Sequence, residues 1–187
     1  MPLNALVVLA AILLFQPFVQ AQTAIESFVD RSAFSAAANG LKTIDFEGIA
    51  ANSGFVTFKR EGRFVTDGIE FRPGGGNRFG PGAVTIVGPW YQAGPAFETT
   101  SGAKLIWSPP NQPGDAYLDV TLPGGTTAVA ADVWAAQPYT SPVEVVVSTE
   151  DGGSRTVTIS TPARPSAAFV GFTSRSPIRS IRFTPAK

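Results

Sequence analysis

The chain has 187 residues, with 14 basic and 14 acidic side chains and neither histidine nor cysteine. Without these two residue types it has no disulfide, thiolate metal site, cysteine nucleophile, Ser-His-Asp triad or histidine-ligated zinc or haem. The formal net charge of zero argues against nucleic acid as a partner, since nucleic-acid-binding proteins normally carry a basic excess. Hydrophobic residues make up 44% of the chain, which is enough to bury a core.

The first segment has the features of a secretory signal peptide. Residues Leu3–Phe15 form an almost entirely apolar run, and Val19 and Ala21 occupy the −3 and −1 positions of a small-residue cleavage site. An uncleaved N-terminal anchor is the alternative, since no basic residue precedes the run, but the run is shorter than the roughly 20 residues of a spanning helix. We therefore expect residues 1–21 to be removed. Residues 22–187 are then a single secreted domain without a membrane span.

One helix is expected near the start of the mature chain. Asp30 has the short acceptor side chain that is preferred at a helix N-cap, and Phe34 supplies an apolar contact. Ala36–Ala38 favour helix, and Asn39-Gly40 is a stop signal because glycine readily adopts the left-handed conformation at a helix end. The pattern predicts a short helix between Asp30 and Gly40.

After this helix, short strand-like segments alternate with turns rich in glycine and proline. The segments have period-two patterning and are enriched in β-branched and aromatic residues, which favours β-strands. Turn signals such as Asp67-Gly68 and Asp151-Gly152-Gly153 accompany them. The predicted strands are Thr43–Phe46, Phe64–Phe71, Ala83–Val87, Lys104–Trp107, Ala116–Leu122, Ala128–Ala135, Val143–Thr149, Arg155–Ser160, Ala168–Phe172 and Ile178–Thr184.

About ten short strands with one early helix are typical of an all-β protein. We predict an antiparallel β-sandwich or jelly roll, with an up-and-down barrel as the alternative. In the hairpin that precedes the last two strands, Val157 and Ile159 are expected to face inward. Thr156 and Thr158 then face outward. The glycine-rich segment Pro73–Gly82 is expected to form no strand.

Five short motifs occur together along the mature chain. They are Thr43–Gly48, Val65–Phe71, Thr126–Val133, Phe169–Ser174 and Pro177–Phe183. With the early helix and the signal peptide, they resemble the secreted β-sandwich domain common in bacterial proteins of the PEP-CTERM, exosortase-sorted type, mostly of unassigned function. The sorting tail of that group is not present, so the resemblance does not extend to surface anchoring. It implies a domain similar to jelly-roll carbohydrate-binding modules, which often carry a structural calcium ion.

Acidic residues form the first candidate site. Asp45 and Glu47 are two apart on a predicted strand, so their carboxylates point to the same side. Such a pair can ligate calcium or act as acid and base in glycoside cleavage, although a solvated outer face is the simpler interpretation. Asp132 lies among Ala128 and Ala130 on one face, where a carboxylate needs a partner. The candidate metal ligands are Asp45, Glu47 and Asp132, and structural calcium is the one cofactor suggested.

Aromatic residues form the second candidate site. Rings at loop or strand ends can stack on the apolar faces of sugar rings, while nearby polar side chains bond the hydroxyls. Trp90 and Tyr91 lie in a polar loop rich in glycine and proline and are expected to be exposed. Trp107 and Trp134 fit core positions of a sandwich better. The candidate ligand-binding residues are Trp90, Tyr91, Tyr139, Trp134 and Trp107.

Charge is unevenly distributed along the chain. Residues 152–187 contain six basic side chains and no acidic ones, whereas residues 22–151 contain 8 basic and 14 acidic side chains. A basic C-terminal part can face anionic polysaccharide or a membrane surface. The interpretation that we favour is that the two parts interleave in one sandwich, so that their charges pair.

Three functions remain open from the sequence. The first is a secreted, non-enzymatic binding or matrix domain that recognises extracellular polysaccharide or another cell-surface component. The second is a secreted carbohydrate-active enzyme, which needs two carboxylates roughly 5 to 9.5 Å apart across a cleft. The third is a structural envelope protein that self-associates through a strand edge. We favour the first, because carboxylates, arginines and aromatic rings suit binding more readily than catalysis.

Overall fold

The structure is a computed structural model with 12 strands and one helix in the part of the chain that it describes. The described residues are 24–44, 46, 49, 55–58, 63–74, 83–87, 104–108, 117–133, 141–162 and 167–186, with the backbone alone for 55–58, 83–87, 104–108 and 141. The elements are β1 (Glu26–Phe28), α1 (Arg31–Ala37), β2 (Phe55–Phe58), β3 (Phe64–Thr66), β4 (Ile69–Gly74), β5 (Ala83–Val87), β6 (Lys104–Ser108), β7 (Tyr117–Thr121), β8 (Ala128–Val133), β9 (Ser141–Thr149), β10 (Ser154–Thr161), β11 (Ala168–Thr173) and β12 (Ile178–Pro185).

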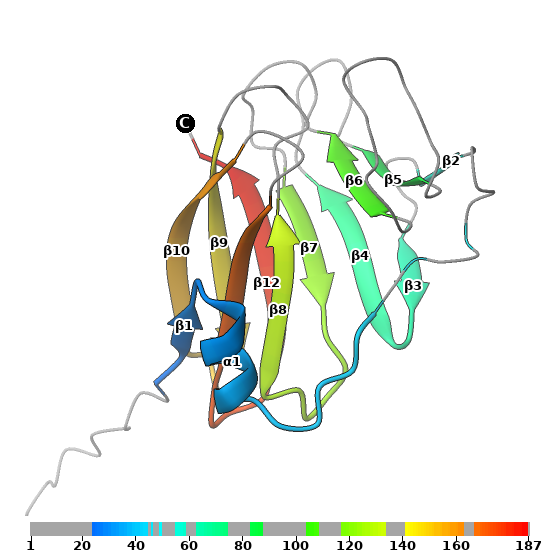
Figure 1. Ribbon diagram of the computed structural model, residues 1–187. Helices are drawn as coiled ribbons and strands as arrows, with labels where there is room; N and C mark the ends of the chain where they lie inside the picture. The colour runs from blue at the N-terminus through cyan, green and yellow to red at the C-terminus, as the bar shows by residue number, and fades with distance from the viewer. Residues whose placement is uncertain are drawn as a thin grey trace, which may run out of the picture.

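The strands form antiparallel sheets, two of which pack face to face (Figure 1). The large sheet has the order β10-β9-β12-β7-β4-β3, and the small sheet has the order β1-β11-β8. Both contribute to one buried cluster, for example Val145 and Ile181 from the large sheet and Val170 and Phe172 from the small one. A third sheet has the order β2-β5-β6. The predicted all-β, sandwich-like fold with one short helix is confirmed.

Alternation along each strand separates a core face from an outer face. Val145 and Val147 of β9 are fully buried, whereas Val146 between them is only partly buried on the outer face. Val157 and Ile159 of β10 pack on the core while their neighbours Thr156 and Thr158 are exposed, as predicted. Burial of each such aliphatic side chain contributes about 1.5–3 kcal/mol, which fixes which face of each strand points inward.

The predicted strand Phe64–Phe71 is a hairpin of two strands. Asp67 and Gly68 both have positive φ angles, 51° and 78°, and the flanking Thr66 and Ile69 pair with each other. This is the two-residue type I′ turn that Asp-Gly sequences favour. The turn signal therefore overrides the strand-like pattern on either side of it, and the prediction of one continuous strand is wrong.

Two further predictions are wrong over their described residues. Thr43, Ile44 and Phe46 lie in no strand, although Phe46 packs on the core with its ring centroid 6.1 Å from that of Phe64. The proline and glycine that begin the segment Pro73–Gly82 belong to β4, because they pair with β7. Proline is tolerated there because β4 extends beyond β3, so that Pro73 has no partner in β3 that needs its missing N–H.

The predicted helix is confirmed as α1. Asp30 caps its start, since Oδ1 accepts hydrogen bonds from the Ser32 hydroxyl at 2.6 Å and from the Ala33 N–H at 2.7 Å. These bonds, the one from Ser32 first, hold the pKa of Asp30 below its ordinary value. The helix ends where the Ala38 N–H donates to the Phe34 carbonyl, and Gly40 has a φ of 63°. No helix within the described residues is long and apolar enough to cross a membrane.

Helix α1 packs on part of the outer face of the small sheet, against β1 and β11 (Figure 1). The ring centroid of Phe34 lies 5.8 Å from that of Phe28 in β1 and 5.6 Å from that of Phe169 in β11. A Cβ atom on Gly171 would lie 2.7 Å from the Phe34 ring, so glycine at this position lets the helix approach the sheet closely. Phe34 is consequently 3% exposed.

Candidate functional site

Most residues of the two predicted sites lie outside the described part of the chain. Those that do are Asp45, Glu47, Trp90, Tyr91, Trp134 and Tyr139. Trp107 lies in β6, where it pairs with Val84 of β5, and its backbone alone is described. Their binding roles remain predictions. Asp132 is the predicted site residue whose side chain can be placed.

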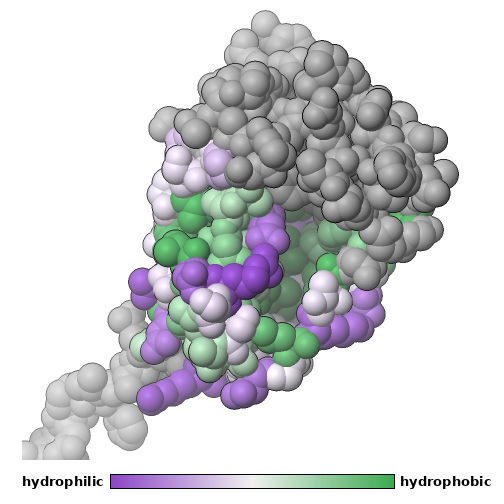
Figure 2. All heavy atoms as spheres, viewed as in Figure 1, coloured by the Kyte–Doolittle hydropathy of each residue, from purple (hydrophilic) through white to green (hydrophobic). Residues whose placement is uncertain are grey.

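Asp132 lies on the outer face of the small sheet and has a partner. Nη2 of Arg31 is 2.5 Å from each carboxylate oxygen, and the Arg31 guanidinium lies 4.7 Å from the centroid of the Phe169 ring. Figure 2 shows a hydrophilic belt across this face, with hydrophobic surface on both sides. The Asp132 side chain is 49% exposed. The partner that the sequence pattern predicts for it is therefore Arg31, a surface residue of α1.

Asp132 alone does not make a metal site. Within the described residues, no group of three or more Asp or Glu side chains is arranged to hold a metal ion. Asp45 and Glu47 lie outside the described residues, so calcium ligation by Asp45, Glu47 and Asp132 stays a prediction. The observed role of Asp132 is to tie α1 to β8.

The outer face of the large sheet carries a second constellation, which we call the charged band. It consists of Arg63, Glu70, Arg72, Asp119 and Arg182. Arg182 of β12 lies opposite Asp119 of β7, which lies opposite Arg72 of β4, so these three form one row across neighbouring strands. Adjacent strands lie about 4.8 Å apart, which sets the spacing along the row.

Arg182 is held on two sides. Its Nε and Nη2 donate to the two oxygens of Asp119 at 2.7 and 2.8 Å, and its guanidinium lies 3.9 Å from the centroid of the Tyr117 ring. A Cβ atom at Gly74 would collide with that ring, so the glycine leaves room for Tyr117 to lie across β4. The hydrogen bonds that Arg182 donates to Asp119 raise the pKa of Arg182 above its ordinary value. The side chain is 47% exposed, and neither contact uses Nη1.

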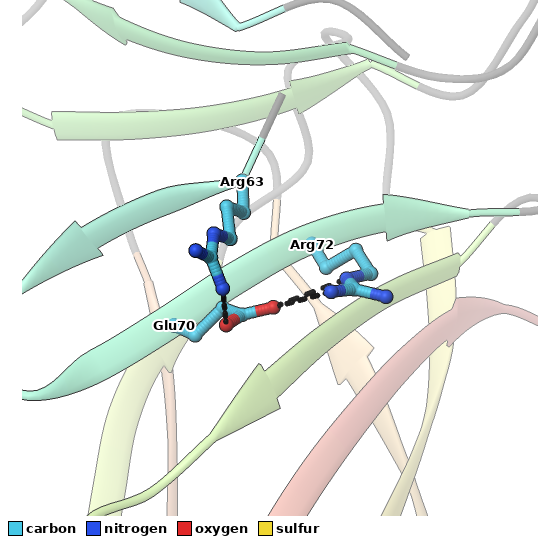
Figure 3. Close-up of polar contacts among 3 residues, drawn as sticks. All are labelled: Arg63, Glu70 and Arg72. Carbon is cyan, nitrogen blue, oxygen red and sulfur yellow. Dashed lines mark hydrogen bonds and ion pairs between the residues drawn. The ribbon is translucent and has the colours of Figure 1, made fainter. Parts of the chain in front are cut away.

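Glu70 lies between two arginines on the β3–β4 hairpin (Figure 3). Arg72 Nη2 is 2.8 Å from Oε1, and Arg63 Nη1 is 3.4 Å from Oε2. Both arginines are exposed, whereas Glu70 is partly buried between them. The carboxylate therefore orients two guanidinium groups whose remaining N–H groups face solvent.

The charged band has the chemistry of a binding surface for polar groups, because its carboxylates orient arginine side chains that are exposed to solvent. Three guanidinium groups and two carboxylates give it nearly balanced charge. Each carboxylate accepts from arginine, and the bidentate geometry leaves further arginine donors free to contact a ligand. Hydroxyl, carboxylate and sulfate groups are the chemical groups that such donors recognise.

Sequence reasoning did not single out the charged band or Tyr117. The local signal was present, because Glu70, Arg72, Asp119 and Arg182 are all at outward positions of period-two segments. The sequence pattern does not reveal the strand order and register, which place β12, β7 and β4 side by side. The Arg182–Asp119 pair does match the expectation that the basic C-terminal part pairs with earlier acidic residues.

No protein-family model, no curated protein and no solved structure matches the chain. Two surfaces are therefore compared on their own chemistry. Both ion-pair clusters are exposed, but Arg31 and Asp132 join α1 to β8, whereas the charged band presents three arginines on one face of the large sheet. Of these two, the charged band is the candidate binding site.

Proposed function

We propose that the chain is an exported, non-enzymatic binding domain whose ligand is an extracellular carbohydrate chain held on the outer face of the large sheet. The observation that supports this most directly is the row Arg182, Asp119 and Arg72, with its guanidinium groups oriented by carboxylates. Side chains that are ordered before binding lose little conformational entropy when the ligand arrives.

The direction of the row favours a linear ligand. The register continues from Arg182 to Val146 of β9 and Thr156 of β10, so the row runs across the strands over most of the sheet. Neighbouring positions are about 4.8 Å apart, close to the length of one pyranose unit. A sugar chain laid across the strands would meet one side chain of the row for each sugar ring, with hydroxyls bonded by arginine and carboxylate groups.

Two sequence features support the same proposal. The predicted signal peptide at residues 1–21 would direct the domain out of the cytoplasm, to where polysaccharides are abundant. The predicted exposed pair Trp90 and Tyr91 would add aromatic stacking, which the charged band does not offer because Arg182 occupies the Tyr117 ring. The resemblance to secreted sandwich domains points in the same direction.

A glycan array with the exported protein tests the proposal. Arg182→Met and Arg72→Met should each weaken binding roughly tenfold or more, because each removes charge-assisted hydrogen bonds. Arg31→Met is the matched control, since Arg31 is also paired with an aspartate and stacked on an aromatic ring but lies on the small sheet. Its binding should equal that of the unsubstituted protein.

Other outcomes assign the site elsewhere or reject the proposal. If Trp90→Ala abolishes binding while the arginine variants keep it, the ligand binds the loop and not the charged band. If no glycan binds, the carbohydrate proposal fails. Repeating the array and a thermal melt after chelation tests calcium: an unchanged melting temperature and unchanged binding would contradict a structural or ligand-bridging calcium ion.

A further inference from the structure

Edge strands of a sheet expose unpaired N–H and C=O groups, and three of the four edges in the two packed sheets are poor partners for another strand. Within the described chain, β1 and β3 have only three residues each. Strand β8 carries the charged Asp132 and lies within the width of the large sheet (Figure 1), so a second molecule approaching it would meet that sheet. These edges are short or obstructed.

The fourth edge strand, β10, is neither short nor obstructed in the described part of the chain. It has eight residues, contains no proline and pairs with β9 in unbroken register from Ser154 to Thr161. In the described part of the large sheet β9 is its neighbour on one side, and Figure 1 shows β10 at the border of the sheet. Its outward-facing side chains, Thr156 and Thr158 among them, are small hydroxyl residues.

We propose that β10 pairs antiparallel with β10 of a second copy of this chain, about a two-fold axis perpendicular to the sheet. An interface made by one strand with itself is closed, so it yields a dimer and not an open fibre. The occupant of the edge is argued from the sequence of β10, which is complementary to itself. This proposal does not depend on carbohydrate binding.

The self-complementary register is centred on Thr158. Residues directly opposite each other in an antiparallel pair share a face, so Thr158 lies opposite Thr158 of the second copy and Thr156 opposite Ser160. On the core side Val157 then lies opposite Ile159. Hydroxyl pairs and β-branched apolar pairs across strands are both stabilising.

Charge does not oppose this register. Arg155 is the one charged residue in β10, and it lies on the core side, where Nη1 donates to the Ile25 carbonyl at 2.7 Å. It therefore ties β10 to the segment before β1 and does not project along the edge. In the pairing centred on Thr158 the two Arg155 residues lie six positions apart, about 20 Å, which exceeds the screening length of roughly 8 Å in physiological salt.

Sedimentation velocity over a range of concentrations tests the dimer. The unsubstituted protein should change from monomer to dimer as concentration rises. Thr158→Lys places two like charges on the axis and should keep the protein monomeric, with an unchanged melting temperature because the side chain is exposed. Thr121→Lys is the control, an exposed outward position in the same sheet on β7, and should dimerise normally. A protein that stays monomeric up to its solubility limit, or a Thr158→Lys variant that still dimerises, would overturn the proposal.

Cysteine cross-linking tests the register. The chain contains no cysteine, so single substitutions report one position each. Thr158→Cys should form a disulfide-linked dimer under mild oxidation, because it lies opposite itself. Thr156→Cys, on the same strand and face, should not, since it lies opposite Ser160. Equal cross-linking of both variants would indicate random collision and would contradict the pairing.

Discussion

The outer faces of the two packed sheets are built from the same three kinds of side chain but have different surroundings. On the small sheet, Arg31 pairs with Asp132 and stacks on Phe169. On the large sheet, Arg182 pairs with Asp119 and stacks on Tyr117. In the first case the arginine comes from α1 and the cluster anchors a covering helix. In the second it comes from the neighbouring strand of the same sheet, and the cluster anchors no helix.

This difference shows that an arginine, aspartate and aromatic cluster can serve to hold a helix against a sheet. The difference between the two clusters comes from the other side chains on the same face of each sheet. Phe28, Phe169 and Gly171 make the small sheet's outer face apolar, so it needs a cover, and Phe34 supplies it. The charged band makes the large sheet's outer face polar enough to remain exposed. The following substitutions test this contrast, beginning with the largest expected effect.

Substituting one aromatic residue on each face should lower the free energy of unfolding by unequal amounts. Phe34→Ala should lower the free energy of unfolding by about 3–5 kcal/mol, because it empties a buried site and uncovers the apolar face. Tyr117→Ala, on the open face, should cost about 1 kcal/mol, since the ring is only partly buried. Urea denaturation measures both. Equal losses would mean that the two faces contribute alike and that the contrast is wrong.

The close approach of α1 predicts an unusual sensitivity at Gly171. Gly171→Ala should cost about 1–3 kcal/mol, because the new methyl group meets the Phe34 ring and the helix must shift. Gly124→Ala is the control, since its nearest neighbour would be Glu150 at an ordinary 3.9 Å. Guanidinium denaturation of the two variants compares them directly. A Gly171→Ala protein as stable as the control would show that α1 is not closely packed.

The two ion pairs should differ modestly in strength. Double-mutant cycles should give a coupling below about 1 kcal/mol for each pair, because all four side chains are substantially exposed. Arg182–Asp119 should be the stronger pair, since two different guanidinium nitrogens donate to it and its carboxylate is 26% exposed against 49% for Asp132. Both couplings should fall in high salt. A larger coupling energy for Arg31–Asp132 than for Arg182–Asp119 would contradict this order of strength.

The smallest effect is expected at the helix cap, and it depends on pH. The pKa of Asp30 is lower in the folded chain, so its charge stabilises the fold above the ordinary aspartate pKa, and this contribution is lost as the pH falls through the lowered value. Thermal melting of Asp30→Ala should show a slightly reduced melting temperature at neutral pH. The difference from the unsubstituted protein should shrink in acid. A difference that is constant with pH would contradict the role of the charge.

Local signals in the sequence predicted the elements that depend on local structure. The cap at Asp30 located the helix, and the turn at Asp151-Gly152-Gly153 located the hairpin of β9 and β10. The strand Glu26–Phe28 was missed because it has only three residues and exists through its pairing with β11. At Asp67-Gly68 the strand-like pattern continues on both sides of the turn signal, and it therefore predicts one strand where the structure has two.

The candidate site was less predictable than the fold. Asp45 and Glu47 are candidates because they are two apart on a predicted strand, and the aromatic residues because they are expected at the ends of loops or strands. The charged band joins Arg182 and Asp119, which are 63 residues apart, and only the strand order brings them together. Period-two patterning tells which side chains face outward, but not which strands are neighbours.

The contact between Arg155 and the Ile25 carbonyl has a consequence for how the chain folds. These residues are 130 positions apart, and β1, which follows Ile25, pairs with β11 still further along the chain. Contacts of such long range form slowly, because the intervening chain must be ordered first. A chain synthesised from its N-terminus therefore holds residues 24–28 without their partners until β11 has emerged. During that interval the beginning of the chain lacks the strand partner that it has in the folded protein.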